Sequence, residues 1–217
     1  MNLHGKKINI LGDSITEGYG VSCPEHSYIN LIASRCGAIC RNYGISGSRI
    51  AIQKTPSANP RFDLYFASRV DEMDTDADVV IVFGGTNDFG HGDAPLGSAE
   101  DRTPETFRGG LHALYTKLIE RYPDKLIVVV TPLHRWNENN PHGDDKPNPV
   151  GTLRDYVQII RQVAEFYSLP VLDLFASYGI QPCLTAHREM YVPDGLHPND
   201  KGHEILANKF IKFLETC

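Results

Sequence analysis

The chain has 217 residues, of which 41% are hydrophobic and 22% charged, a composition typical of a globular protein with one domain. Its 21 Lys and Arg residues against 27 Asp and Glu give a formal net charge of -6. That balance offers no general attraction for nucleic acid or an anionic membrane surface, so neither is expected as a partner. No apolar stretch approaches the roughly 18 residues needed to span a bilayer.

The cysteine count and the N-terminal sequence indicate the cellular compartment in which the protein is expected. There are five cysteines, an odd number, and none forms a C-x-x-C pair. A disulfide framework is therefore not expected, and a reducing compartment is favoured. The first residues lead into an apolar run without the h-region or cleavage site of a signal peptide. The sequence thus predicts a cytoplasmic protein.

Five short runs rich in Val, Ile and Leu predict strands. In chain order they are Lys7–Leu11, the weaker Ala38–Tyr43, Asp78–Phe83, Lys125–Thr131 and Pro170–Phe175. Most of them lack a clean alternation of apolar and polar residues, which is typical of parallel strands covered on both faces.

Amphipathic patterns between these runs predict helices. They cover His26–Cys36, Arg61–Met73, Pro104–Tyr122, Thr152–Tyr167 and Asp200–Leu214, and Thr103 is the expected N-cap of the third. Strands that alternate with helices indicate an α/β fold in which helices cover both faces of a parallel sheet. We expect one domain over residues 1–217, with two long polar loops at 87–102 and 132–150 that are candidates for function.

Polar residues and glycines follow the predicted strands, at the edge where open α/β sheets bind ligands. Ser14 follows the first strand, Gly44 the second and Asn87 the third, and Asp194 and His197 precede the last helix. We expect these five residues to converge. They are the components of acyl transfer by a serine nucleophile.

The chemistry assigns a role to each residue. Ser14 is the candidate nucleophile, His197 the base that takes its proton, and Asp194 the acid that fixes the histidine tautomer. The backbone N–H groups of Ser14 and Gly44 and the side-chain amide of Asn87 are candidate donors to the oxyanion. The alternative for Ser14 is a structural one, in which it only caps the following helix.

Four sequence blocks carry a resemblance to a known family. They are GDSIT with Ser14, NYGISG with Gly44, GGTND with Asn87, and DGLHP with Asp194 and His197. In this order, over residues 12–198, the chain resembles the SGNH hydrolase superfamily of GDSL-type esterases, lipases and acylhydrolases. The resemblance implies a flavodoxin-like three-layer α/β/α sandwich with a five-stranded parallel sheet, and it supports the roles above. Ile15 replaces the leucine of the eponymous GDSL block, a change expected to affect packing only.

Other polar and aromatic residues near the same edge are candidates for substrate contact or for local packing. They are Asp13, Phe89, His91, Arg135 and Trp136. Asp13 is expected chiefly as a structural hydrogen-bond partner. The loop residues His134, His142, Asp144 and Asp145 match no ligand spacing, so no metal is expected.

The sequence thus predicts a serine esterase that cleaves small soluble or acetylated-carbohydrate esters through an acyl-enzyme, without a cofactor. A lysophospholipase, a thioesterase and an acyltransferase are alternatives that would use the same residues. A non-catalytic binding module on the same fold is another alternative, although Asp13 and Glu17 would repel an anion at the GDSITEG turn. The oligomeric state is left open.

Overall fold

A single five-stranded parallel sheet lies at the centre of the computed structural model, which describes all residues from 1 to 217. The strands are β1 (Lys7–Gly12), β2 (Ile39–Gly44), β3 (Val79–Phe83), β4 (Leu126–Val130) and β5 (Val171–Leu172). Their order is β2-β1-β3-β4-β5, and every neighbouring pair is parallel. This is the flavodoxin-like order, in which the chain reverses direction across the sheet beside β1.

Strands that are buried on both faces have the most apolar sequences and were therefore the clearest to predict. All five residues of β3 (VVIVF) are buried, and so are all residues of β1 except the first. The strand β2 lies at one edge of the sheet and none of its residues is fully buried, which explains its weaker pattern. At the other edge β5 is shorter than expected, because the Asp173 side chain accepts a hydrogen bond from the Ala176 N–H and starts the next helix.

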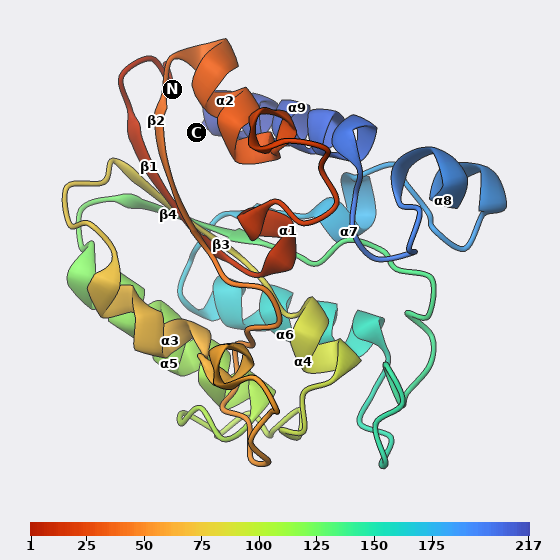
Figure 1. The fold of residues 1–217 in the computed structure, drawn as a ribbon. Coiled ribbons are helices and arrows are strands. Elements are labelled where there is room, and N and C mark those ends of the chain that lie inside the picture. The colour runs from red at the N-terminus through yellow and green to blue at the C-terminus, as the bar shows by residue number, and fades with distance from the viewer.

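Helices cover both faces of the sheet, so the predicted three-layer α/β/α sandwich is confirmed (Figure 1). One face is covered by α2 (Tyr28–Cys36) and α9 (Asp200–Thr216), and the other by α3 (Phe66–Arg69), α5 (Phe107–Arg121) and α6 (Leu153–Phe166). Tyr28 stacks on Phe210 in the first core with ring centroids 4.9 Å apart, and Phe107 meets Tyr156 edge-to-face in the second at 4.7 Å.

Shorter helices occupy the connections. They are α1 (Ser14–Glu17), α4 (Thr86–Gly90), α7 (Leu174–Ser177) and α8 (Thr185–Tyr191), with 3-10 turns η1 (Pro24–His26), η2 (Pro60–Asp63) and η3 (Val70–Glu72). The helices α1 and α4 follow β1 and β3 directly. Both therefore begin at the carboxyl edge of the sheet, where the polar sequence blocks were expected to meet.

Two helix predictions need correction. The continuous helix expected over 61–73 is broken into η2, α3 and η3, since the Phe66 N–H donates to the Arg49 carbonyl and the Arg49 side chain binds the Phe62 carbonyl. The N-cap of α5 is Thr106 rather than Thr103. The Thr106 side chain accepts from the Gly109 N–H at 3.1 Å.

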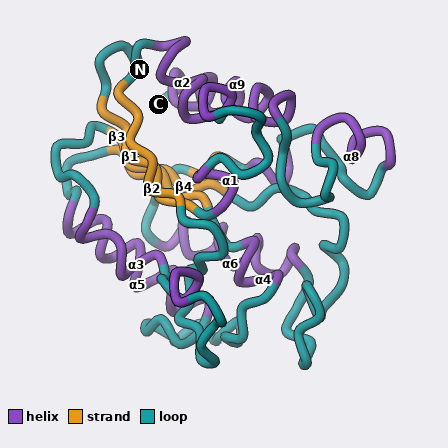
Figure 2. Tube along the Cα trace, viewed as in Figure 1, coloured by secondary structure: helices purple, strands orange, loops and turns teal.

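Long loop segments lie beyond the ends of the strands, as the tube view in Figure 2 shows. The two chain termini lie close together in Figure 1, and the N-terminal amine donates to the carbonyls of Leu214 and Glu215 at the end of α9. No helix in the structure combines the length and the apolar character required to traverse a bilayer.

Candidate active site

Ser14 lies in a tight turn between β1 and α1. The turn needs a glycine at position 12, because a Cβ atom there would lie 2.0 Å from the Thr16 hydroxyl. Asp13 is the N-cap of α1, and its side chain accepts a hydrogen bond from the Ile15 N–H at 3.1 Å. The cap is therefore Asp13, and the structural alternative proposed for Ser14 does not apply. Ser14 itself is 6% exposed, so only a small part of it reaches the solvent.

His197 lies within hydrogen-bond distance of Ser14, although 183 residues separate them in the chain. The Ser14 Oγ and the His197 Nε2 are 3.0 Å apart, and the His197 Nδ1 lies 2.6 Å from the Asp194 Oδ2. A carboxylate can only accept, so the Nδ1 carries the proton and the Nε2 presents its lone pair to the serine hydroxyl. The arrangement can remove a proton from Ser14.

The Asp194 carboxylate is fixed by its own turn. Its Oδ1 accepts from the N–H groups of Leu196 at 2.9 Å and His197 at 2.7 Å. Gly195 has a φ of 81°, a conformation that glycine adopts without strain. Partial burial acts to raise the pKa of Asp194, but the hydrogen bonds from His197 and Leu196 outweigh it and lower the pKa to about 2. The group is thus ionised wherever His197 can act as a base.

The candidate oxyanion donors differ in their availability. The Ser14 N–H, in the first residue of α1, makes no hydrogen bond. The Asn87 Nδ2 donates to the Ser48 carbonyl at 3.0 Å, which leaves its second N–H free. The Gly44 N–H, in contrast, donates to the Asn42 Oδ1 at 2.8 Å and is not free.

Gly47 was not singled out from the sequence, yet it carries a free donor. Its N–H makes no hydrogen bond, and the next residue, Ser48, provides the carbonyl that binds Asn87. Its φ is 75°, and a Cβ atom there would lie 2.6 Å from the Phe62 ring. The block NYGISG contains both glycines and also Asn42. An asparagine two residues before Gly44 is a local signal that the Gly44 N–H can be bonded already.

Two aromatic side chains lie at the turn that carries Asp194 and His197. The Tyr19 ring lies 4.4 Å from the His197 ring between centroids, and 58% of Tyr19 is exposed. Trp136 is 54% exposed, its backbone N–H donates to the Gly195 carbonyl at 2.9 Å, and its side chain lies against the Gly195 backbone. Trp136 is thus the one of the five candidate contact residues whose side chain lies open beside the Asp194–His197 turn.

The other four candidate contact residues are largely enclosed. Phe89 is fully buried and packs edge-to-face on Tyr156, and Arg135 is buried between Phe89 and the Asp144 carboxylate. These positions give Phe89 and Arg135 a structural role rather than an open face toward a substrate.

Asp13 and His91 are also engaged inside the protein. Burial raises the pKa of Asp13 to about 6, against the hydrogen bond from Ile15 that lowers it. His91 lies between Arg49 and Asn87, with each ring nitrogen in contact with one of them.

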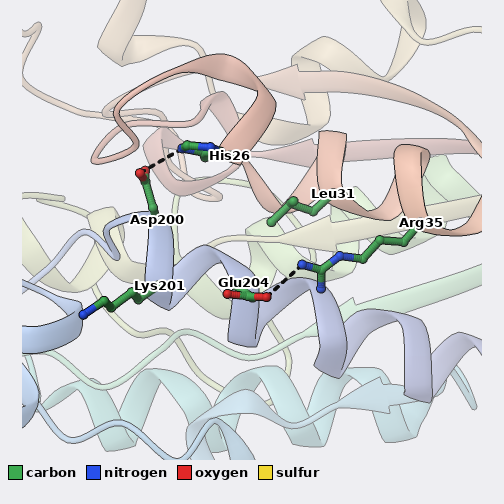
Figure 3. Close-up of a pocket in the computed structure, with 6 residues that line it drawn as sticks. All are labelled: His26, Leu31, Arg35, Asp200, Lys201 and Glu204. Carbon is green, nitrogen blue, oxygen red and sulfur yellow. Dashed lines mark hydrogen bonds and ion pairs between the residues drawn. The ribbon is translucent and has the colours of Figure 1, made fainter.

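A second serine–histidine–aspartate group lies on the surface, but its geometry differs. Ser22 Oγ and Asp200 Oδ2 both approach the same His26 nitrogen, Nδ1, at 3.0 and 2.8 Å, and Ser22 also bonds Asp200 directly. A base between a nucleophile and an acid needs both ring nitrogens. Figure 3 shows the His26–Asp200 pair beside the Arg35–Glu204 pair in a shallow pocket between α2 and α9. The group ties the loop after α1 to the start of α9.

The residues weighed as metal ligands have separate partners. His134 binds Glu138 at 2.6 Å, His142 approaches the Lys146 carbonyl at 2.9 Å, and Asp144 pairs with Arg135. No group of three or more His, Cys, Asp or Glu side chains is arranged to hold a metal ion.

A comparison with protein families adds to this geometry. The model of the GDSL-like lipase/acylhydrolase family matches residues 10–205. The chain belongs to this family. The predicted resemblance is thereby confirmed, and this GDSL-like protein is a carboxylic ester hydrolase. Among curated proteins, none matches the chain.

Solved structures agree with the family. A Lactobacillus plantarum protein is 32% identical to this GDSL-like hydrolase, with 98% of each chain covered and a TM-score of 0.83. The Mycobacterium smegmatis aryl esterase is 18% identical, with 98% of this chain and 99% of that chain covered and a TM-score of 0.73. The Enterococcus faecalis lipase/acylhydrolase is 22% identical, with coverages of 97% and 96% and a TM-score of 0.67. The last two likenesses show the shared fold.

Proposed function

We propose that this GDSL-like hydrolase cleaves small soluble carboxylic esters through an acyl-enzyme on Ser14. The observation that carries the proposal is the continuous series Ser14 Oγ–His197 Nε2–His197 Nδ1–Asp194 Oδ2, with contacts of 3.0 and 2.6 Å. It supplies a nucleophile, a base in the required tautomer and an ionised acid.

The reaction proceeds in two halves. Ser14 Oγ attacks the ester carbonyl carbon while His197 Nε2 takes the hydroxyl proton, and Asp194 stabilises the imidazolium. His197 then gives the proton to the departing alcohol, which leaves an acyl group on Ser14. A water molecule attacks this acyl group with His197 again as the base, and the acid is released.

The oxyanion needs donors at the carbonyl oxygen. We assign this role to the Ser14 N–H, the free side-chain N–H of Asn87 and the Gly47 N–H. Gly47 takes the place first given to Gly44, because the Gly44 N–H is bonded to Asn42.

The surroundings of Ser14 support a small substrate. Five hollows of 240 to 480 Å³ on the surface are lined by residues other than Ser14 and His197. A long acyl chain would need an apolar channel at the serine. The exposed Tyr19 ring beside His197 and the exposed Trp136 ring beside Gly195 offer flat apolar faces on which a sugar or aryl group could stack. Acetylated carbohydrates are therefore the first natural substrates to test.

The test measures hydrolysis of p-nitrophenyl esters of increasing acyl length by the wild type and by Ser14→Ala. We expect activity to fall with acyl length, and the substitution to lower kcat/KM about 10³-fold or more. Ser34→Ala is the matched control, since Ser34 lies on α2 and bonds only the Leu31 carbonyl. Equal activity of the wild type and Ser14→Ala would contradict a mechanism in which Ser14 is the nucleophile.

The same assay separates the alternatives. Adding an alcohol and analysing the products distinguishes acyl transfer from hydrolysis, since both proceed from the same acyl-enzyme. Acetylated sugars, lysophospholipids and acyl thioesters are then compared by kcat/KM. A preference for lysophospholipids or long-chain thioesters would contradict the small-ester assignment.

A further inference from the structure

The Asn87 side chain is held from two sides. Its Nδ2 donates to the Ser48 carbonyl at 3.0 Å, and its Oδ1 lies 3.3 Å from the His91 Nε2. Asn87 lies in α4 and His91 is the residue that ends this helix, so the two side chains come from one short segment and meet directly. An amide has two N–H donors and one carbonyl, and its orientation decides which of them faces the nucleophile.

Arg49 fixes the proton position on His91. The Arg49 Nη1 lies 2.7 Å from the His91 Nδ1, and a guanidinium can only donate. The Nδ1 is therefore the acceptor, the ring proton lies on Nε2, and the Nε2–H donates to the Asn87 Oδ1. Burial, together with the Arg49 charge, lowers the pKa of His91 to about 4, so the ring is neutral near pH 7.

Arg49 is itself held rigidly. It is 2% exposed, and its Nη2 donates to the Phe62 carbonyl and to the Asp63 Oδ1, both at 2.8 Å. The Asp88 carboxylate accepts from the N–H groups of Ile50 and Ala51 that follow Arg49. The segment that carries Arg49 is thus tied to α4, the helix that carries Asn87.

We propose that Arg49 and His91 are positioning residues that orient the Asn87 amide, so that its free N–H and not its carbonyl oxygen faces the developing oxyanion. The inference rests on the proposed function, in which Asn87 donates to that oxyanion. If the His91 proton moved to Nδ1, the Nε2 lone pair would repel the Asn87 Oδ1 and favour the flipped amide. The Arg49 guanidinium disfavours that tautomer, because the Arg49 N–H would then face the His91 Nδ1–H instead of a hydrogen-bond acceptor.

The first test compares His91→Phe with His91→Gln on p-nitrophenyl acetate. Phenylalanine removes the donor to the Asn87 Oδ1, and we expect kcat to fall about tenfold or more with little change in KM, within the 10²–10³-fold cost of losing one oxyanion donor. Glutamine offers a donor to Asn87 and an acceptor to Arg49, so it should restore most of the activity. A merely structural role would instead lower Tm, and Gln would not rescue kcat selectively.

A second test uses the pH dependence of Arg49→Met, which leaves His91 free to choose its tautomer. A protonated imidazole must donate from Nε2, so the ratio of variant to wild-type kcat should rise as pH falls from about 7 to 5. Other charged groups that act on His91 are Arg135, Lys146 and Asp144. Burial lowers the pKa of Lys146 to about 8 and raises that of Asp88 to about 6, and the Arg49 charge acts on Asp88. The ratio is therefore compared between about pH 7 and 5, and it is measured again in an Asp88→Asn background, which removes the Asp88 titration. A ratio that does not change with pH would overturn the tautomer argument.

Measurements on Asn87→Ala show whether a negative result contradicts the positioning role of His91 or the oxyanion role of Asn87. If Asn87→Ala alone leaves kcat unchanged, Asn87 does not donate to the oxyanion. If Asn87→Ala lowers kcat but His91→Phe does not, only the positioning role of Arg49 and His91 is contradicted. We expect His91→Phe to have no further effect on kcat in the Asn87→Ala background, because the two changes would act through the same hydrogen bond. Additive effects would contradict it.

Discussion

At the residue scale, the proposed mechanism depends on which nitrogen of each histidine carries the proton. In His197 the proton lies on Nδ1, because the Asp194 carboxylate at 2.6 Å can only accept. In His91 it lies on Nε2, because the Arg49 guanidinium can only donate. The sequence predicted the first pair from its three-residue spacing. It did not predict the second, since Arg49 and His91 belong to different segments that only the folded chain brings together.

Asp194→Asn tests the His197 tautomer directly. The asparagine amide can donate to the His197 Nδ1, which would move the ring proton to Nε2 and leave no lone pair for the Ser14 proton. We expect kcat to fall about 10³-fold or more while substrate binding changes little, as measured by steady-state kinetics on p-nitrophenyl acetate. Asp124→Asn is the control, because Asp124 is an exposed acid that pairs only with Lys125. A kcat within a few-fold of the wild type would remove Asp194 from the mechanism.

At the element scale, periodicity located the long helices, but tertiary hydrogen bonds set their ends. The segment 61–73 has apolar residues at helical spacing, yet its backbone groups bond Arg49 and the helix is broken. At α5 the N–H groups of Phe107 and Arg108 donate to the carbonyls of Pro95 and Leu96. These partners lie in a loop that no local pattern identifies. Sequence therefore could not choose between Thr103 and Thr106 as the cap.

Thr106→Ala and Thr103→Ala test this correction. Loss of the Thr106 cap leaves the Gly109 N–H without its acceptor, and we expect the free energy of unfolding to fall by about 1 kcal/mol. Thr103→Ala should change it by less than about 0.5 kcal/mol, as for surface substitutions outside a cap. Urea denaturation of both variants measures the difference. A larger loss in Thr103→Ala than in Thr106→Ala would restore Thr103 as the cap.

At the scale of the whole molecule, the sheet topology explains why residues distant in the sequence could be expected to form one candidate site. Parallel strands present all their carboxyl ends at one edge, so the residues that follow β1 and β3 meet there whatever their distance in sequence. This placed Ser14 and Asn87 at one edge with His197. What the topology does not determine is which backbone donors remain free there: the Gly44 N–H is bonded to Asn42, whereas the Gly47 N–H is free.

The buried acids Asp13 and Asp88 make the stability of the whole fold depend on pH. Burial raises the pKa of each to about 6, although hydrogen bonds from the N–H groups of Ile15 and Ala51, respectively, act to lower it. In the unfolded chain an aspartate has a pKa of about 3.9. Between about pH 4 and 6 the native state therefore binds more protons than the unfolded state, so the contribution of these groups to stability falls as pH rises through that window.

Asp88→Asn removes one of the two groups. The slope of unfolding free energy against pH should then become less negative by up to about 1.4 kcal/mol per pH unit between pH 4.5 and 5.5, and remain unchanged above pH 7. Asp13→Asn should produce a shift of similar size, since its carboxyl is equally enclosed. Urea denaturation at half-unit pH intervals gives the slope. The slope is unaffected if the substitution also lowers the free energy of unfolding by the same amount at every pH. Parallel curves for wild type and variants would show that these carboxyls titrate as they do in the unfolded chain.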